Sequence, residues 1–151
     1  MSSVDAEVFL YNHSDETMHN EWPTMPLLPV SWGEVFDKLT ILCIKAEKLT
    51  DSEKLANIEL EKKESSMVVG DIARFPVELL PLVEELKQIN ERLWDVEDGK
   101  RDCERRQCFD ESFVRLAREV YFGNDQRAAI KRKINELLGS AIVEEKSYKA
   151  Y

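Results

Sequence analysis

The sequence predicts an all-α protein, a small bundle of about five helices that contains a long central helical pair. Glycine and proline number only five each in 151 residues, while 34% of the residues are charged, and stretches rich in Leu, Glu, Lys and Arg favour helix over sheet. Apolar residues recur at alternating spacings of three and four, as in an amphipathic helix. The hydrophobic fraction of 43% suffices for one core, so residues 30–151 are expected to form a single domain.

Residues 1–29 are predicted to be a flexible N-terminal arm outside this domain. They mix acidic residues, Asn and Ser with three prolines, and chain ends of this kind are seldom ordered. The stretch Val8–Tyr11 has the composition of a short strand but no evident strand to pair with. Trp22 and Leu27 are expected to anchor the arm. A basic, apolar leader is not seen, so no signal peptide is expected.

The first helix is predicted to start after Ser31 and to be central in the bundle. Ser31 as N-cap and Glu34 three residues later form a capping box. The main apolar stripe of the helix comprises Val35, Leu39, Leu42, Ala46 and Leu49. Ile41 and Ile44 lie on another side, and a helix that is apolar nearly all round runs through the middle of a bundle. Its polar residues are therefore candidates for burial, and buried charges need partners.

The second and third helices differ sharply in their apolar content. Asp51 caps a strongly charged second helix that is expected to end near residue 64. A connection containing Gly70 and Pro76 follows. The long third helix, from about residue 76 to 106, has a continuous apolar stripe formed by Leu82, Leu86, Ile89, Leu93 and Val96.

Two shorter helices are predicted to complete the bundle. Asp110 is the N-cap of the fourth helix. The sequence Gly-Asn-Asp at 123–125 is interpreted as the end of the fourth helix, a turn and the cap of a fifth. Gly139 is expected to end the fifth helix.

The third helix carries the sharpest functional signal, where its apolar stripe gives way to charges. Lys100 and Glu104 fall on the same face as the stripe, and Glu97 and Arg101 flank it. One interpretation is a solvated helix end with a weak Glu97–Arg101 surface pair. The other is that the charges stay against the bundle and line a polar cavity, where charges of both signs must be paired.

Charged residues on two other helices would complete such a cavity. Lys38 and Lys45 project in the same direction from neighbouring turns of the first helix, and Arg127 lies at the N-terminus of the fifth, a position suited to anions. The charges on the third helix are expected to face one of these lysines and Arg127. Each of the three also has a simpler explanation as a snorkelling lysine or a structural salt bridge. The predicted ligand-binding residues are Glu34, Asp37, Lys38, Lys45, Glu97, Asp98, Arg101, Glu104 and Arg127.

Charge and cysteine content argue against several classes of protein. A net charge of −9 is unfavourable for binding nucleic acid or an anionic membrane. The acidic excess lies in residues 1–99, however, so residues 100–151 could still contribute to one anion-binding site. No apolar run approaches the roughly 20 residues of a membrane span. The three cysteines form no CxxC motif and suit a reducing cytoplasm, so a cytoplasmic protein is expected.

The sequence identifies no cofactor. Both histidines lie in the N-terminal arm, and no Cys/His spacing is typical of a zinc site. A Mg²⁺ site among facing carboxylates has weak support. No glycine-rich phosphate loop and no GxSxG motif occurs, and the carboxylates lack the register of helical nucleotide pyrophosphohydrolases.

Four segments resemble a family of short helical, mostly bacterial proteins of unknown function. They are PVSWGEVFDKLTILCIK, LWDVED, FDESFVRLAREVYFGNDQRA and EEKSY, and together they extend the resemblance over residues 29–151. Genes of that family are often found near glycosyltransferase or surface-polysaccharide genes. The resemblance therefore implies a link between this chain and polysaccharide biosynthesis. The matching positions are Ser31, Gly33, Glu34, Asp37, Lys38, Lys45, Glu97, Asp98, Arg101, Asn124, Asp125 and Arg127. Cys43 and Gly99-Lys100 depart from the pattern, and the glycine is expected to loosen the third helix.

Three functional classes remain open at this stage. The leading one is an accessory or binding protein with a polar pocket for an anionic small molecule, a sugar phosphate or sugar nucleotide, linked to polysaccharide biosynthesis. The second is a small helical enzyme that uses the same pocket, mutase-like or nucleotide pyrophosphohydrolase-like. The third is an interaction module that docks on a protein partner such as a glycosyltransferase. The sequence does not settle the oligomeric state.

Overall fold

The computed structural model describes residues 21–149, which form four α-helices, one short 3-10 turn and no strand. The elements are α1 (Trp32–Lys48), α2 (Ser52–Val69), η2 (Ile72–Arg74), α3 (Leu79–Arg106) and α4 (Glu111–Leu138). The predicted all-α class is confirmed, while the stretch Val8–Tyr11 lies outside the described residues. None of the helices in 21–149 is long and apolar enough to cross a membrane.

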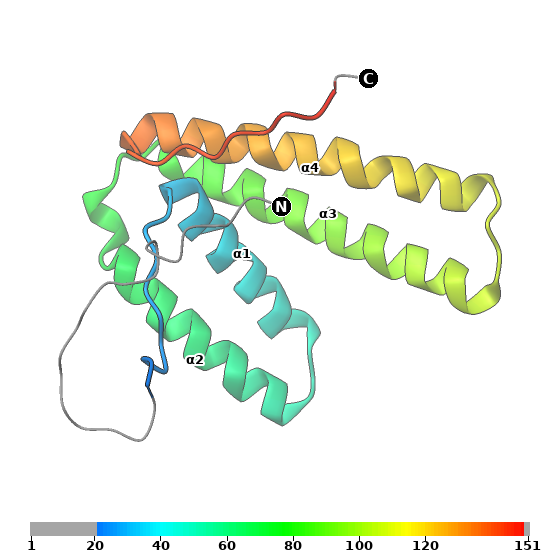
Figure 1. Ribbon diagram of the computed structural model, residues 1–151, viewed down its shortest axis with the longest axis horizontal. Coiled ribbons are helices and arrows are strands. Elements are labelled where there is room, and N and C mark those ends of the chain that lie inside the picture. The colour runs from blue at the N-terminus through cyan, green and yellow to red at the C-terminus, as the bar shows by residue number, and fades with distance from the viewer. Residues whose placement is uncertain (1–20, 150–151) are drawn as a thin grey trace, which may run out of the picture.

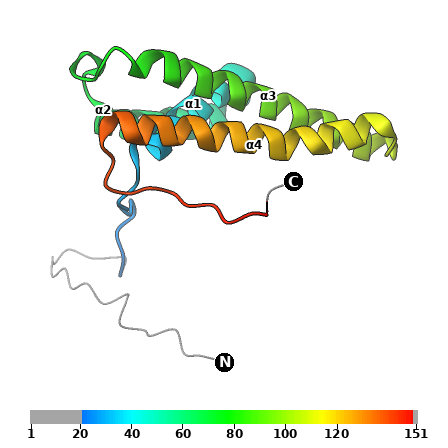
Figure 2. The same ribbon diagram turned by 90° about the horizontal axis from the view of Figure 1, so that it is seen from above.

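Two helical hairpins of unequal length make up the fold (Figure 1). α3 and α4 run antiparallel and side by side, and the shorter α1–α2 hairpin lies beside one end of them (Figure 2). α1 contacts each of the other three helices. The prediction of a central first helix is confirmed, because Ile44 is buried and Ile41 is half-buried. The far ends of α3 and α4 extend beyond α1 (Figure 1).

α4 is a single helix of 28 residues, whereas the sequence predicts two helices separated by a turn at 123–125. That prediction is wrong because Gly123 serves helix packing rather than chain reversal. A Cβ atom on Gly123 would lie 2.7 Å from Cδ2 of Leu93 on α3, so the glycine permits a close approach of the two helices. Asn124 and Asp125 continue the helix, and the bundle has four helices rather than about five.

The capping residues predicted for three helices are confirmed. The Ser31 hydroxyl accepts a hydrogen bond of 3.2 Å from the Glu34 N–H. The Asp51 carboxylate accepts one of 2.9 Å from the Lys54 N–H, and Asp110 caps α4 in the same manner. Each of these bonds satisfies a backbone donor that the first turn of a helix leaves free.

Two helix boundaries differ from the prediction. α2 continues past residue 64 to Val69. The Val69 side chain is buried against α1 and α3, and this burial stabilises the extra turn. Gly70, with a φ of +63°, ends the helix, as a residue without a Cβ can. α3 begins at Leu79 rather than near Pro76.

The hydrophobic core lies where all four helices meet. Its buried members are Phe36, Val69, Leu79, Leu86, Ile89, Ile130 and Ile134. Each such side chain contributes about 1.5–3 kcal/mol by leaving water. Trp22 and Leu27 are 69% and 90% exposed, so the prediction that they anchor the N-terminal arm is wrong.

Candidate functional site

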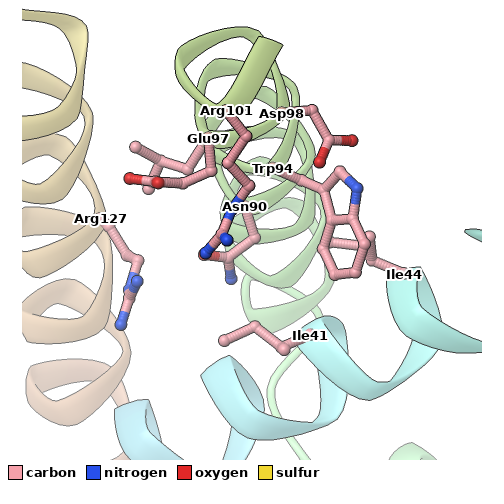
Figure 3. Close-up of a pocket in the computed structure, with 9 residues that line it drawn as sticks. Ile41, Ile44, Asn90, Trp94, Glu97, Asp98, Arg101 and Arg127 are labelled. Carbon is pink, nitrogen blue, oxygen red and sulfur yellow. The ribbon is translucent and has the colours of Figure 1, made fainter. Parts of the chain in front are cut away.

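A pocket of about 310 Å³ lies between α1, α3 and α4, next to the core (Figure 3). One part of its lining is apolar and the rest is polar or charged. The apolar residues are Ile41, Ile44, Leu93 and Trp94, and the polar residues are Asn90, Glu97, Asp98, Arg101 and Arg127.

α3 supplies most of the polar lining because of a simple spacing. Asn90, Trp94, Glu97, Asp98 and Arg101 recur every three or four residues, so they share one face of the helix. The neighbouring face carries the buried seam toward α4, which continues to the buried Cys103. The charges therefore lie beside the apolar seam and open onto the angle between α3 and α1 (Figure 3).

Arg127 enters the pocket from α4 and is held from behind by a buried carboxylate. Its NH2 group lies 3.2 Å from Oδ2 of Asp37 on α1, and Asp37 is only 2% exposed. The Asn90 amide nitrogen donates to Oδ1 of Asp37 at 2.8 Å and to the hydroxyl oxygen of Thr40 at 3.1 Å. One aspartate on α1 thus orients pocket side chains from two other helices.

Lys131, one turn further along α4, connects this polar set to the first turn of α1 and to the C-terminal segment. Its amino group lies 2.7 Å from Glu34, 2.7 Å from Glu144 and 4.0 Å from Asp37. Burial alone would lower the pKa of Lys131, but the hydrogen bonds with Glu144 and Glu34 and the nearby negative charges outweigh it and raise this pKa. Lys131 is therefore a charged link between α1, α4 and the C-terminal segment.

The N-terminus of α1 docks directly on α4 beside this link. The Gly33 N–H donates to Oδ1 of Asn135 at 2.6 Å, and the Trp32 N–H donates to the Ser140 hydroxyl at 3.2 Å. A Cβ on Gly33 would lie 2.6 Å from the Lys131 carbonyl oxygen, so only glycine fits this contact without a shift of the backbone. These bonds set the position of α1 and hence one wall of the pocket.

Arg101 has no ion-pair or hydrogen-bond partner within residues 21–149, although its side chain lines the pocket. The Glu97–Arg101 surface pair considered from the sequence is not formed. Glu97 instead pairs with Lys100 at 3.1 Å. Arg101 is exposed, so its guanidinium keeps its hydrogen-bond donors for water or a ligand.

A family model described as "Family of unknown function (DUF6165)" matches residues 27–151. The chain belongs to this family. Comparison with curated proteins and with solved structures gave no match. The matched residues cover the 29–151 region of the resemblance described above, and the family description assigns no activity.

The structure brings four of the nine predicted ligand-binding residues of this DUF6165 protein to one pocket: Glu97, Asp98, Arg101 and Arg127. Asp37 lies directly behind Arg127, and Glu34 belongs to the Lys131 link. This grouping concerns their positions, and ligand binding itself stays a prediction.

Three predicted residues lie elsewhere in the DUF6165 fold. Lys38 is directed toward α2, where it forms an ion pair with Glu61. Glu104 is exposed near the end of α3, beyond the reach of α1, and accepts a hydrogen bond from Gln107. Lys45 is half-buried in the last turn of α1 and does not line this pocket. The prediction that Glu97, Arg101 and Glu104 together face Lys38 is wrong, because spacing along one helix does not specify the neighbour that each face meets.

Sequence reasoning missed Asn90, Trp94 and Lys131. Asn90 is a single polar residue inside an apolar stripe, which is a signal for a buried hydrogen bond, and Trp94 follows it by one helical turn. Lys131 was hidden in a basic cluster that had the composition of a solvated face. Within the described chain, no group of three or more His, Cys, Asp or Glu side chains is arranged to hold a metal ion.

Proposed function

We propose that this protein binds a small anionic molecule in the pocket between α1, α3 and α4, and that it acts as an accessory or binding protein. The observation that supports this most directly is the convergence of Arg101 and Arg127 on one space from two different helices (Figure 3). Guanidinium groups match the oxygens of phosphate and carboxylate with paired hydrogen bonds.

The state of the two arginines favours an external anion. Arg127 is oriented by the buried Asp37, whereas Arg101 has no partner in residues 21–149. A ligand anion would neutralise this second cation, which no residue in 21–149 pairs. In a chain of net charge −9, such a local pair of cations is also the means of attracting an anion at close range.

The remaining lining favours a sugar phosphate over a purely ionic ligand. Trp94 and Ile41 offer an apolar surface for the carbon face of a ring. Glu97 and Asp98 offer acceptors for hydroxyl groups, and they would repel a ligand of high negative charge. The volume of about 310 Å³ lies at the small end of ligand pockets, which span about 300–1,000 Å³, so a sugar phosphate suits it better than a sugar nucleotide. A ligand of this class would also fit the link with polysaccharide biosynthesis that the family resemblance implies.

Binding of glucose 6-phosphate, measured by calorimetry and by thermal shift, tests the proposal. The unmodified protein should bind glucose 6-phosphate more tightly than glucose, which lacks the phosphate and serves as the uncharged control. Arg101→Ala should weaken binding at least tenfold, a loss of about 1.4 kcal/mol. It should not change the melting temperature in the absence of ligand, because Arg101 is exposed and has no partner among the described residues.

The matched control is Arg105→Ala, one turn further along α3, where the guanidinium pairs with Asp102 outside the pocket. This variant should bind like the unmodified protein. Absence of binding to the unmodified protein, or equal affinities for Arg101→Ala and Arg105→Ala, would contradict the proposal.

A further inference from the structure

We infer that the Asn90 side-chain oxygen is a specificity determinant of this pocket, which makes a hydroxyl donor on the ligand as necessary as its anion. The inference rests on the proposed binding site and goes beyond it, because it names the group that distinguishes a hydroxylated phosphate ester from other phosphates. Its evidence is the set of hydrogen bonds around Asn90, the burial of this residue and its place in the pocket lining.

The two acceptors on α1 fix the orientation of the Asn90 amide. The Asp37 carboxylate can only accept hydrogen bonds, and Asn90 lies 2.8 Å from its Oδ1. The Thr40 hydroxyl already donates its single hydrogen to the Asp37 carbonyl oxygen at 2.8 Å, so it accepts from Asn90 at 3.1 Å. An amide oxygen in this position would face acceptors on both sides. The nitrogen must therefore point toward α1, and its two hydrogens are both used.

The Asn90 oxygen is consequently left for the pocket. Asn90 accepts no hydrogen bond from any residue in 21–149. No buried side-chain nitrogen or oxygen in this part of the chain lacks a partner, so the unbonded Oδ1 is open to the space that Asn90 lines. Asn90 as a whole is only 5% exposed, which means that the oxygen meets solvent or ligand through the pocket.

A buried acceptor with a fixed orientation distinguishes ligands by whether they can donate a hydrogen bond to it. A ligand hydroxyl group can donate a hydrogen bond to this oxygen in place of solvent, whereas a methylene group excludes solvent and leaves the oxygen unpaired. Asp37 and Thr40 act as positioning residues, because they hold the amide without lining this pocket themselves. In this arrangement the two arginines bind the anion of the ligand, and the Asn90 oxygen accepts a hydrogen bond from one of its hydroxyl groups.

The test compares two phosphate esters of similar ring size on the unmodified full chain. Glucose 6-phosphate carries ring hydroxyls, and cyclohexyl phosphate has the same anion on a ring without them. We expect glucose 6-phosphate to bind at least tenfold more tightly. Equal affinity, or tighter binding of cyclohexyl phosphate, would overturn the role of Asn90 and leave the anion site standing. If neither ester nor inorganic phosphate binds, the proposed function itself fails, and this inference fails with it.

Variants at the positioning residue give a second readout that does not depend on replacing Asn90. Thr40→Val keeps the shape of the side chain but removes one of the two acceptors that hold the amide, so Asn90 is oriented by Asp37 alone and the preference for glucose 6-phosphate should fall severalfold. Binding of inorganic phosphate should remain, because the arginines are untouched. Thr40→Ser retains the hydroxyl and should restore the preference. An unchanged ratio of the two affinities in Thr40→Val would argue against positioning by Thr40.

Discussion

The two ends of the α3–α4 hairpin have the same kinds of residues but different surroundings. Near α1, polar side chains are buried and shared among three helices, as Asp37 is with Asn90 and Arg127. At the far end, beyond α1, Asp102 pairs with Arg105 and Arg106 within one turn of α3, and these side chains stay largely exposed. A third helix is what converts a charged helix face into a site.

This difference explains why equal spacing in the sequence has unequal consequences. Arg101 and Arg105 are one helical turn apart and lie in the same kind of charged context. Arg101 opens onto the pocket formed with α1, while Arg105 meets only a carboxylate on its own helix. The reach of α1 along α3 therefore decides which of the two arginines lines a pocket.

The largest expected effect comes from removing the buried carboxylate near α1. Asp37→Ala removes the carboxylate that pairs with Arg127 and lies near Lys131, and it leaves Asn90 with Thr40 as its remaining acceptor, so it should lower the free energy of unfolding by about 3–5 kcal/mol. Asp102→Ala at the far end should change it by less than about 1 kcal/mol, because exposed pairs contribute little. Urea unfolding followed by circular dichroism measures both. Similar midpoints for the two variants would remove the distinction between the ends.

Glycine substitutions sharpen the same contrast at a smaller scale. Gly33→Ala would place its Cβ 2.6 Å from a backbone oxygen of α4, and the resulting displacement of α1 should cost about 1–3 kcal/mol. Gly99→Ala meets only the Leu116 side chain, at 3.1 Å, and its gain in helix propensity of about 1 kcal/mol offsets the crowding. Thermal melts should show a clear loss for Gly33→Ala and little change for Gly99→Ala. A stable Gly33→Ala protein would mean that α1 tolerates a wider separation from α4.

Loss of the α1 cap should have an intermediate to small effect. Ser31→Ala removes the acceptor of the Glu34 N–H and should lower the free energy of unfolding by about 0.5–2 kcal/mol. Ser31→Thr retains a hydroxyl acceptor without placing a charge at this buried position, so it serves as the control. An unchanged urea midpoint for Ser31→Ala would show that the bond contributes nothing to stability.

The smallest predicted effect is a pH-dependent release of the C-terminal segment. The hydrogen bond from Lys131 lowers the pKa of Glu144 below its usual value. A carboxylate with a depressed pKa in the folded state stabilises the fold above its usual pKa, and this contribution is lost as the pH falls through the depressed value. Protection factors of the amides in residues 140–149, which correct for the slower intrinsic exchange at low pH, should therefore fall at acidic pH. Glu144→Gln should show low protection factors already at neutral pH, and protection equal to that of the unmodified protein would contradict the prediction.

The sequence alone predicted much of the fold but only part of the site. The caps at Ser31, Asp51 and Asp110 were predictable because each depends on residues within one helical turn. The placement of Lys38 was not, since a helix presents several faces and the sequence does not say which neighbour lies on each. Gly123 was misinterpreted for a related reason, because a glycine that ends a helix and one that admits Leu93 from another helix have the same local context.

The hydrogen bond between the Gly33 N–H and Asn135 joins residues 102 positions apart. During synthesis, α1 leaves the ribosome long before Arg127, Lys131 and Asn135 have been translated. The α3–α4 hairpin can form through contacts that are closer in sequence and therefore faster, but Asp37 meets its cationic partners only when the second half of α4 emerges. The pocket therefore cannot be completed before the second half of α4 has been synthesised, and a chain interrupted before that point would have most of the helices without the pocket.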